Sequence, residues 1–274
     1  MRESEQILTG LVPMSARLEA IAALAGQGDT VCDVGCDHAH VPIRLLQTRC
    51  YRRAIGMDVI EGPLGKAAGN LALYGMQDRV ELRLSNGLDA FIPGEADTLV
   101  ITGMGGTLME DILLREPAKT ASFRILVLGP QSDPEKVRAA LRRLGFVITR
   151  EQLIFEDGKY YPVIRAQSRI EERACKAAFA QEVPGMIRRE AEDMFGPVLL
   201  EERDPVLLEF LTRRTAVLEK IVRSIRQAAQ EAAQDACREP ELRERHLVRQ
   251  KEIEHSLTVF YAALTAYGKP WRES

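Results

Sequence analysis

The chain has 274 residues, of which 46% are hydrophobic and 28% charged. This composition excludes an intrinsically disordered or collagen-like chain, and the length predicts one large or two modest domains, because a domain takes about 150 residues. The formal net charge is −3, so nucleic-acid binding requires a local basic patch. No apolar run approaches the roughly 20 residues that cross a bilayer, and the polar start of the chain lacks a signal-peptide hydrophobic region. We expect a cytoplasmic protein with no membrane partner.

Short apolar runs alternate with stretches of helical spacing from about residue 15 to residue 167. The spacing predicts strands at residues 30–34, 53–58, 80–84, 98–102, 124–128, 146–155 and 159–166. It predicts helices that start after Ser15, a candidate N-cap, and then cover residues 41–46, 63–74, 108–114 and 134–144. This alternation predicts an α/β fold with a mostly parallel sheet and helices on both faces. The last two strands predict an antiparallel edge.

Beyond about residue 172 the pattern becomes purely helical. One series of apolar or small residues repeats with heptad spacing at Leu208, Leu211, Thr215, Leu218, Val222, Ile225, Ala229 and Ala232. After Pro240 a second series follows at Ile253, Leu257, Phe260, Leu264 and Tyr267. Two such runs, joined near residues 237–240, predict an antiparallel coiled-coil hairpin. We therefore divide the chain into an α/β domain, residues 1–170, and a helical domain, residues 171–274.

The first predicted strand runs into a polar turn, with the sequence Val-Cys-Asp-Val-Gly-Cys-Asp-His-Ala-His at 31–40. Ligands of open α/β sheets bind at the carboxyl ends of strands, and Gly35 allows the backbone to approach a ligand closely. Asp33, Asp37 and His38 offer hydrogen-bonding groups suited to an ammonium or an amide. A plain polar turn is the alternative. The Gly-x-Gly-x-x-Gly pattern is absent, which disfavours a nicotinamide-dependent oxidoreductase.

The same turn contains four residues that could bind zinc, Cys32, Cys36, His38 and His40. Cys32 falls within the predicted strand and would point into the core, and no second ligand pair has the spacing of a zinc site. We expect no metal.

Three further strand ends carry candidate binding residues. Asp58 ends the second strand, where an acid can accept both hydroxyls of a ribose. Asn86 and Gly87 follow the third strand, and this pair fits an adenine contact and a simple turn equally well. After the fourth strand, Thr-Gly-Met-Gly-Gly-Thr at 102–107 would admit a flat ligand close to the backbone.

Taken together, these motifs resemble the bacterial TrmK family, tRNA (adenine(22)-N1)-methyltransferases that use S-adenosylmethionine. The resemblance rests on Asp-Val-Gly-Cys-Asp-His at 33–38, Asp-Val-Ile-Glu-Gly-Pro at 58–63, Asn-Gly-Leu at 86–88 and Thr-Gly-Met-Gly-Gly-Thr-Leu at 102–108. It extends to residues 15–18, Pro-Gln at 130–131, Arg138, Glu-Asp-Gly-Lys-Tyr-Tyr at 156–161 and Met-Phe-Gly-Pro-Val-Leu at 194–199. It covers most of the chain and implies a Rossmann-like class I methyltransferase sheet followed by a helical domain.

The resemblance also implies roles for the matching residues. The methionine end of the cofactor would be surrounded by Asp33, Gly35, Asp37 and His38. Asp58 would hold the ribose, and the remaining cofactor contacts would come from Asn86, Gly87, Gly103 and Met104. The target-base pocket would be lined by Gly103, Met104, Gly105 and Gly106, with Pro130 and Gln131 opposite and with Arg17 and Tyr161 as further substrate contacts. The chain departs from the common family pattern at residues 86 and 129–131, where members often carry Asp and Gln-Pro-Asn.

Transfer of a methyl group to adenine N1 needs mainly orientation and the exclusion of water. The product is cationic, so an acceptor for the exocyclic amine would stabilise the developing charge. The candidate acceptors are Asp33, Asp37 and the carbonyls of Gly103 and Pro130. No covalent nucleophile is needed.

A base within tRNA must also be extruded, which requires a grip on the RNA backbone. A basic helix face offers one, with Arg213, Arg214, Lys220, Arg223 and Arg226 against Glu219. A solvated helix face is the alternative. Two competing functions remain open at this point. One is a methyltransferase with another substrate and a hairpin used for dimerisation, and the other is a catalytically silent RNA-binding module.

Overall fold

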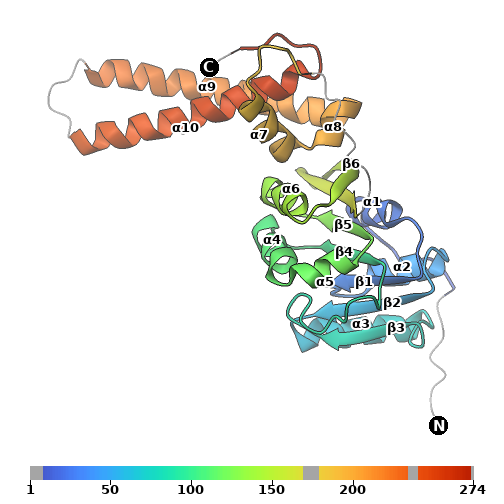
Figure 1. Cartoon of the computed structure of the whole chain (residues 1–274). Coiled ribbons are helices and arrows are strands. Elements are labelled where there is room, and N and C mark those ends of the chain that lie inside the picture. Colours follow the sequence, from blue (N-terminus) through green and yellow to red (C-terminus); the bar gives the residue numbers. More distant parts are fainter. Residues whose placement is uncertain (1–8, 169–178, 234–239, 273–274) are drawn as a thin grey trace. The chain divides into compact units, whose positions relative to one another are not determined.

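The computed structural model describes residues 9–168, 179–233 and 240–272, with side chains in the two long helices described up to residue 228 and from residue 247. The chain divides into two compact units, Met1–Ala174 and Cys175–Ser274 (Figure 1). The domain boundary that we expect after residue 170 falls between the described ranges. Within the described residues, no helix is long and apolar enough to cross a membrane.

The first unit is built on a seven-stranded sheet in the order β3-β2-β1-β4-β5-β7-β6. Its strands are β1 Thr30–Val34, β2 Arg53–Asp58, β3 Val80–Leu84, β4 Thr98–Thr102, β5 Ile125–Gly129, β6 Val147–Glu156 and β7 Lys159–Gln167. The first five strands are parallel, and β7 runs antiparallel to both β5 and β6. The predicted antiparallel edge is confirmed. The outermost strand is β6, because the chain turns back and inserts β7 beside β5.

Helices cover both faces of this sheet, as predicted. They are α1 Ala16–Ala25, α2 His40–Gln47, α3 Glu61–Leu73, α4 Gly106–Arg115, α5 Pro117–Ser122 and α6 Pro134–Arg143. One apolar core lies between the sheet and α4 and α6, and a second lies between the sheet and α1, α2 and α3. Ser15 caps α1, because its hydroxyl accepts from the Leu18 amide at 3.4 Å. The sequence did not predict α5, since six residues are too few to show helical periodicity.

A buried ion pair fastens α6 to the outer strand β6. The Arg138 Nε donates to Glu151 Oε1 at 2.8 Å, and the two side chains are 2% and 0% exposed. Burying a charge without an opposite charge is strongly unfavourable, so the ion pair offsets the cost of burying both residues.

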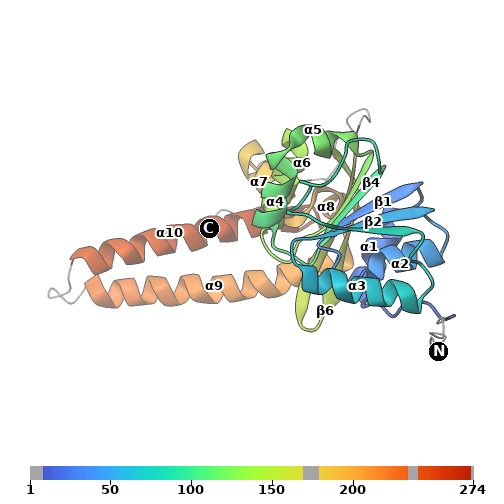
Figure 2. The same cartoon turned by 90° about the horizontal axis from the view of Figure 1, so that it is seen from below.

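The second unit contains α7 Gly185–Phe195, α8 Pro197–Glu202, α9 Pro205–Ala233 and α10 Pro240–Thr265. Helices α9 and α10 lie side by side (Figures 1 and 2). They run antiparallel, because hydrogen bonds join Asp204 to Tyr267, Glu219 to Tyr261 and Arg226 to Glu254. The predicted helical hairpin is confirmed, and supercoiling of the two helices stays a prediction. Cys237 of the predicted connection lies outside the described residues.

The predicted seam is buried over most of its described length. On α9 the buried members are Leu211, Thr215, Leu218 and Val222, and on α10 they are Ile253, Leu257, Phe260 and Leu264. The other seam members with described side chains, Leu208, Ile225 and Tyr267, are half-buried, and Leu207 beside the first of them is buried. The aromatic rings of Phe195, Phe210 and Phe260 contact one another in this unit.

Candidate active site

The turns that follow the parallel strands meet at one edge of the sheet. The strands are in register, so that Val34 pairs with Met57, Asp58 with Leu84, and Thr102 with Gly129. The segments that carry the predicted site residues, 33–38, 58, 86–87, 103–106 and 130–131, therefore follow neighbouring strand ends at the carboxyl edge. This is the edge where open α/β sheets bind ligands.

Asp33 is a buried carboxyl group at this edge. Asp33 is 2% exposed, and its Oδ1 atom has no hydrogen-bond partner. Burial, together with the nearby Asp58 carboxylate, raises the pKa of Asp33 from 3.8 to about 7. A buried acceptor without a partner is costly, so this atom is suited to a ligand that donates a hydrogen bond or carries positive charge.

The turn after β1 is tight and holds unusual backbone conformations. Gly35 has φ +75°, and its amide and that of Cys36 both donate to the Met57 carbonyl, at 2.8 and 3.0 Å. A side chain at Gly35 would meet the Met104 methyl at 2.9 Å. Asp37 has φ +46° although it is not a glycine. Such strain is found where the surroundings dictate the conformation, often at functional sites.

Asp58 links this turn to the end of β2. Its Oδ2 accepts from the Asp37 amide at 3.3 Å, and its Oδ1 accepts from the Ile60 amide at 3.1 Å. These contacts fix the orientation of the carboxylate, and each oxygen keeps acceptor capacity for a hydroxyl. Val59 and Ile60 are 61% and 59% exposed, so an apolar surface lies next to the acid. Sequence reasoning missed these two residues, although two exposed apolar side chains directly after a candidate ribose acid were a usable signal.

The Asn86–Gly87 segment forms a well-packed turn in which the asparagine is exposed. Gly87 is buried with φ +61°, and a side chain there would lie 3.0 Å from Ile112. The Ser85 hydroxyl donates to the Gly87 carbonyl at 2.9 Å and accepts from the Ala90 amide at 3.0 Å. The turn therefore has its own structural basis, and the Asn86 side chain is available to a ligand.

The glycines after β4 divide into two groups. Gly103 is exposed, has φ +81° and has open space where a side chain would lie. Gly106 instead packs against the loop after β5, and a side chain there would lie 2.2 Å from the Asp133 carbonyl. Its amide donates to the Ser132 carbonyl at 2.8 Å. Thus Gly103 leaves room for a ligand, whereas Gly106 is needed for close packing of two loops.

The loop after β5 is tied to the same glycine-rich segment. The Gln131 amide donates to the Met104 carbonyl at 3.0 Å, and Pro130 is buried while Gln131 is exposed. The Thr102 hydroxyl is buried and has no partner, and it would lie 3.0 Å from a side chain at Gly129. A second polar atom at this edge therefore awaits a partner.

Arg17 and Tyr161 are far apart in the sequence but in contact in the structure. The Arg17 guanidinium carbon lies 4.7 Å from the centre of the Tyr161 ring, a cation–π geometry. The Arg17 amide donates to Glu156 at 3.3 Å, and its Nε is buried without a partner. Both residues belong to the predicted substrate-binding set, and the packing of α1 against β7 brings them together.

The cysteines of the first turn are poorly suited to bind zinc or act as nucleophiles. Cys32 and Cys36 are buried, and burial raises the pKa of both thiols. Both roles require the thiolate form. In the described parts of the chain, no group of three or more His, Cys, Asp or Glu side chains is placed to hold a metal ion.

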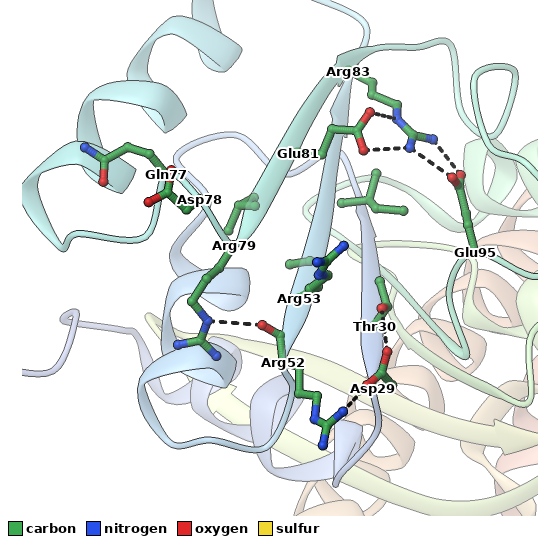
Figure 3. Close-up of a pocket in the computed structure, with 13 residues that line it drawn as sticks. Asp29, Thr30, Arg52, Arg53, Gln77, Asp78, Arg79, Glu81, Arg83 and Glu95 are labelled. Atoms are coloured by element: carbon green, nitrogen blue, oxygen red, sulfur yellow. Dashed lines mark hydrogen bonds and ion pairs between the residues drawn. The ribbon is translucent and has the colours of Figure 1, made fainter.

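A large charged cavity of about 850 Å³ lies at the opposite edge of the sheet (Figure 3). It is lined by Thr30, Arg53 and Val80, the first residues of β1, β2 and β3, so it faces away from the strand ends that carry Asp33. Its Arg83 is held by Glu81 and Glu95 (Figure 3). The cavity is therefore separate from the candidate active site.

The basic face of α9 is partly neutralised. Arg213 pairs with Glu209 at 2.7 Å, and Arg226 pairs with Glu254 at 2.6 Å. Arg214 and Arg223 are exposed, and no ion pair among the described residues holds them. Two of the four predicted arginines are thus immediately available to a phosphate, and sequence reasoning missed the partner Glu254.

Comparisons with known proteins agree with this geometry. A family model described as a methyltransferase domain matches residues 14–164. Over 242 residues the chain is 28% identical to the tRNA (adenine(22)-N(1))-methyltransferase of Bacillus subtilis, covering 88% of this chain and 98% of that protein.

Solved structures with the same fold extend over both units. The crystal structure of the B. subtilis M1A22 tRNA methyltransferase TrmK has a TM-score of 0.75 at 25% identity, covering 92% of this chain and 99% of that one. Streptococcus pneumoniae Sp1610, described as a candidate tRNA (m1A22) methyltransferase and solved with S-adenosyl-L-methionine, has a TM-score of 0.66 at 28% identity, covering 89% of this chain and 100% of that one. The chain thus belongs to the methyltransferase-domain family and, within it, to the TrmK family.

Proposed function

We propose that this protein transfers a methyl group from S-adenosylmethionine to N1 of adenine 22 in tRNA. The observation that carries the proposal is the buried, unpartnered Asp33 oxygen beside the oriented Asp58, at the carboxyl edge of a methyltransferase sheet. The B. subtilis relative, which aligns over nearly its whole length, carries this activity in its name.

The residues present fit S-adenosylmethionine. The unpartnered Asp33 oxygen suits the cationic methionine end, and the open backbone at Gly35 and Gly103 allows a close approach. Asp58 would accept from the ribose hydroxyls. Adenine would lie against the exposed Val59 and Ile60. The remaining cofactor contacts that we propose are Asp37, His38, Asn86, Gly87 and Met104.

The bound cofactor supplies an activated methyl group on a sulfonium. The chain's own residues must orient the target adenine and exclude water, which can contribute several kcal/mol, up to roughly 7–11. Because methylation leaves a positive charge on the base, an acceptor at the exocyclic amine favours the reaction. We propose the Gly103 and Pro130 carbonyls, with Asp33 and Asp37 as the carboxylate candidates.

Two parts of the chain would hold the RNA. Near the reaction site we propose Arg17, Tyr161 and Gln131 as contacts to the extruded nucleotide, with Gly105 and Gly106 forming the pocket wall. In the helical unit we propose phosphate contacts at Arg213, Arg214, Arg223 and Arg226. We assign methyl transfer to residues 1–170 and RNA binding chiefly to residues 171–274, and we infer a cytoplasmic location from the tRNA substrate.

The direct test is methyl transfer from S-adenosylmethionine to unmodified tRNA transcripts, followed by mass spectrometry of the digested nucleosides. We expect 1-methyladenosine, and we expect it to disappear when adenine 22 is replaced. If no methylated nucleoside forms although the protein binds the cofactor, the protein methylates a different substrate or has no catalytic activity.

A further inference from the structure

The helical unit contains a small pocket at the base of its hairpin, in addition to the basic face of α9. It lies between α9, α10 and the segment that follows α10, and its volume is about 250 Å³. Drug-sized ligands occupy sites of roughly 300–1,000 Å³, so this pocket suits a single planar ring system. Its apolar lining includes Ala216, Leu264 and Pro270.

One of the residues that line this pocket carries a buried polar atom without a partner. Thr215 lines the pocket, is 6% exposed, and its hydroxyl oxygen has no hydrogen-bond partner. The sequence placed Thr215 in the apolar seam between the two helices, where a valine would pack equally well without an unpaired hydroxyl. Such an atom is destabilising unless a ligand or water satisfies it, so the hydroxyl is an observation independent of the pocket's shape.

The polar groups beside Thr215 suit a nucleobase. Glu219 also lines the pocket, and one of its oxygens accepts from the Tyr261 hydroxyl at 2.8 Å. Burial and the hydrogen bond with Glu219 raise the pKa of Tyr261, and the nearby Arg272 partly opposes this shift. The second Glu219 oxygen is an acceptor for an N–H group on a base edge. The Tyr261 ring offers a surface for stacking.

The rim of the pocket is cationic. Lys269 and Arg272 line it from the segment after α10. On α9, residues four positions apart lie on the same face, so Lys220 follows Ala216, and Arg223 follows Glu219, along one stripe. An RNA strand with one base in the pocket would therefore meet positive charge on both sides.

We propose that this pocket binds one unstacked nucleotide of the tRNA, with the base against Thr215, Glu219 and Tyr261 and the backbone on Lys269 and Arg272. The inference rests on the proposed function, since it names a second contact with the same substrate. It gives the helical unit a way to recognise a flipped-out base, in addition to attracting phosphates.

The first test compares two exposed positions next to each other on α9. Ala216→Phe fills the pocket, whereas Val217→Phe adds the same ring outside it. We expect Ala216→Phe to raise the KM for tRNA at least tenfold, while kcat at saturating tRNA and cofactor affinity change less than twofold. Val217→Phe should leave all three unchanged. Equal KM values for the two variants would overturn the proposal.

A second variant separates a role in binding from a role in folding. Thr215→Val keeps the shape but removes the unpaired hydroxyl, so the helical unit should melt at the same or a higher temperature while tRNA binding weakens severalfold. Loss of stability together with binding, or unchanged tRNA binding, would contradict the assignment.

The occupant is identified with tRNAs that each lack one base. When the missing base is the one that enters the pocket, the wild type should bind that tRNA at least tenfold more weakly than intact tRNA. The Ala216→Phe variant should bind the two tRNAs equally. If every baseless tRNA loses the same factor with both proteins, no base enters the pocket. This comparison measures tRNA binding and needs no methyl transfer. The pocket proposal can therefore be tested even if the proposed methyl transfer is absent.

Discussion

The burial of Asp33 has a measurable effect on stability. Its pKa is raised from 3.8 to about 7, with burial as the main cause. The folded state therefore favours the neutral carboxyl group. Above about pH 4 the carboxyl of the unfolded chain ionises freely, while the folded one resists ionisation until about pH 7. The folded state thus loses stability as the pH rises through this range, and the loss is complete above pH 7.

The size of this effect follows from the two pKa values. One pKa unit corresponds to about 1.36 kcal/mol, so the full penalty is about 4 kcal/mol above pH 7 and about 1.6 kcal/mol at pH 5. Asp33→Asn removes the ionisation. Relative to the wild type, the variant should gain about 2.5 kcal/mol between pH 5 and pH 8, or roughly 5–10 °C in the melting temperature of the α/β unit.

The assay is thermal unfolding of both proteins without cofactor at pH 5, 6, 7 and 8. Asp78→Asn, at an exposed position, is the matched control and should follow the wild type. The reasoning is refuted if the difference between Asp33→Asn and wild type is the same at pH 5 and at pH 8.

The same variant should bind the cofactor more weakly. A hydrogen bond to a charged group contributes about 1.5–3 kcal/mol, so the Kd for S-adenosylmethionine should rise about 10- to 150-fold by calorimetry. The wild-type affinity should also fall below pH 7, where Asp33 becomes protonated. An unchanged Kd in Asp33→Asn would remove Asp33 from the cofactor site.

Three further predictions concern packing and RNA binding. Glu151→Gln removes the carboxylate that pairs with the buried Arg138 guanidinium and should destabilise the protein by about 3–5 kcal/mol in urea unfolding, whereas a loss below 1 kcal/mol would mean that the pair is dispensable. Gly106→Ala brings a side chain against two backbone carbonyls, so it should lower both kcat and the melting temperature, and an unaltered kcat would show that the two loops separate easily. Replacing Arg214 and Arg223 with Glu should raise the KM for tRNA and flatten its salt dependence without changing cofactor affinity, and unaffected tRNA kinetics would exclude this face of α9 from binding.

The sequence alone determined most of the fold. The first four strands begin and end where predicted. The runs of β1, β2 and β4 are almost wholly buried, whereas β3 lies at the edge of the sheet and is only partly buried. The hairpin of α9 and α10 was also recovered, since its heptad spacing persists over many turns. The helix α5 was missed because six residues are too few to show helical periodicity, and the structure adds a contact that the sequence does not show, the hydrogen bond from the buried Thr120 hydroxyl to the Leu113 carbonyl.

What only the tertiary structure decided is which of the candidate residues lack partners. Asp33 and Asp58 were both visible as acids at strand ends, but only folding leaves an Asp33 oxygen buried without a partner while amides occupy Asp58. Likewise Arg214 and Arg226 look alike in the sequence, and only the antiparallel pairing of the helices gives Arg226 a glutamate. Hydrogen bonding and burial depend on neighbours that are distant along the chain, so no local pattern encodes them.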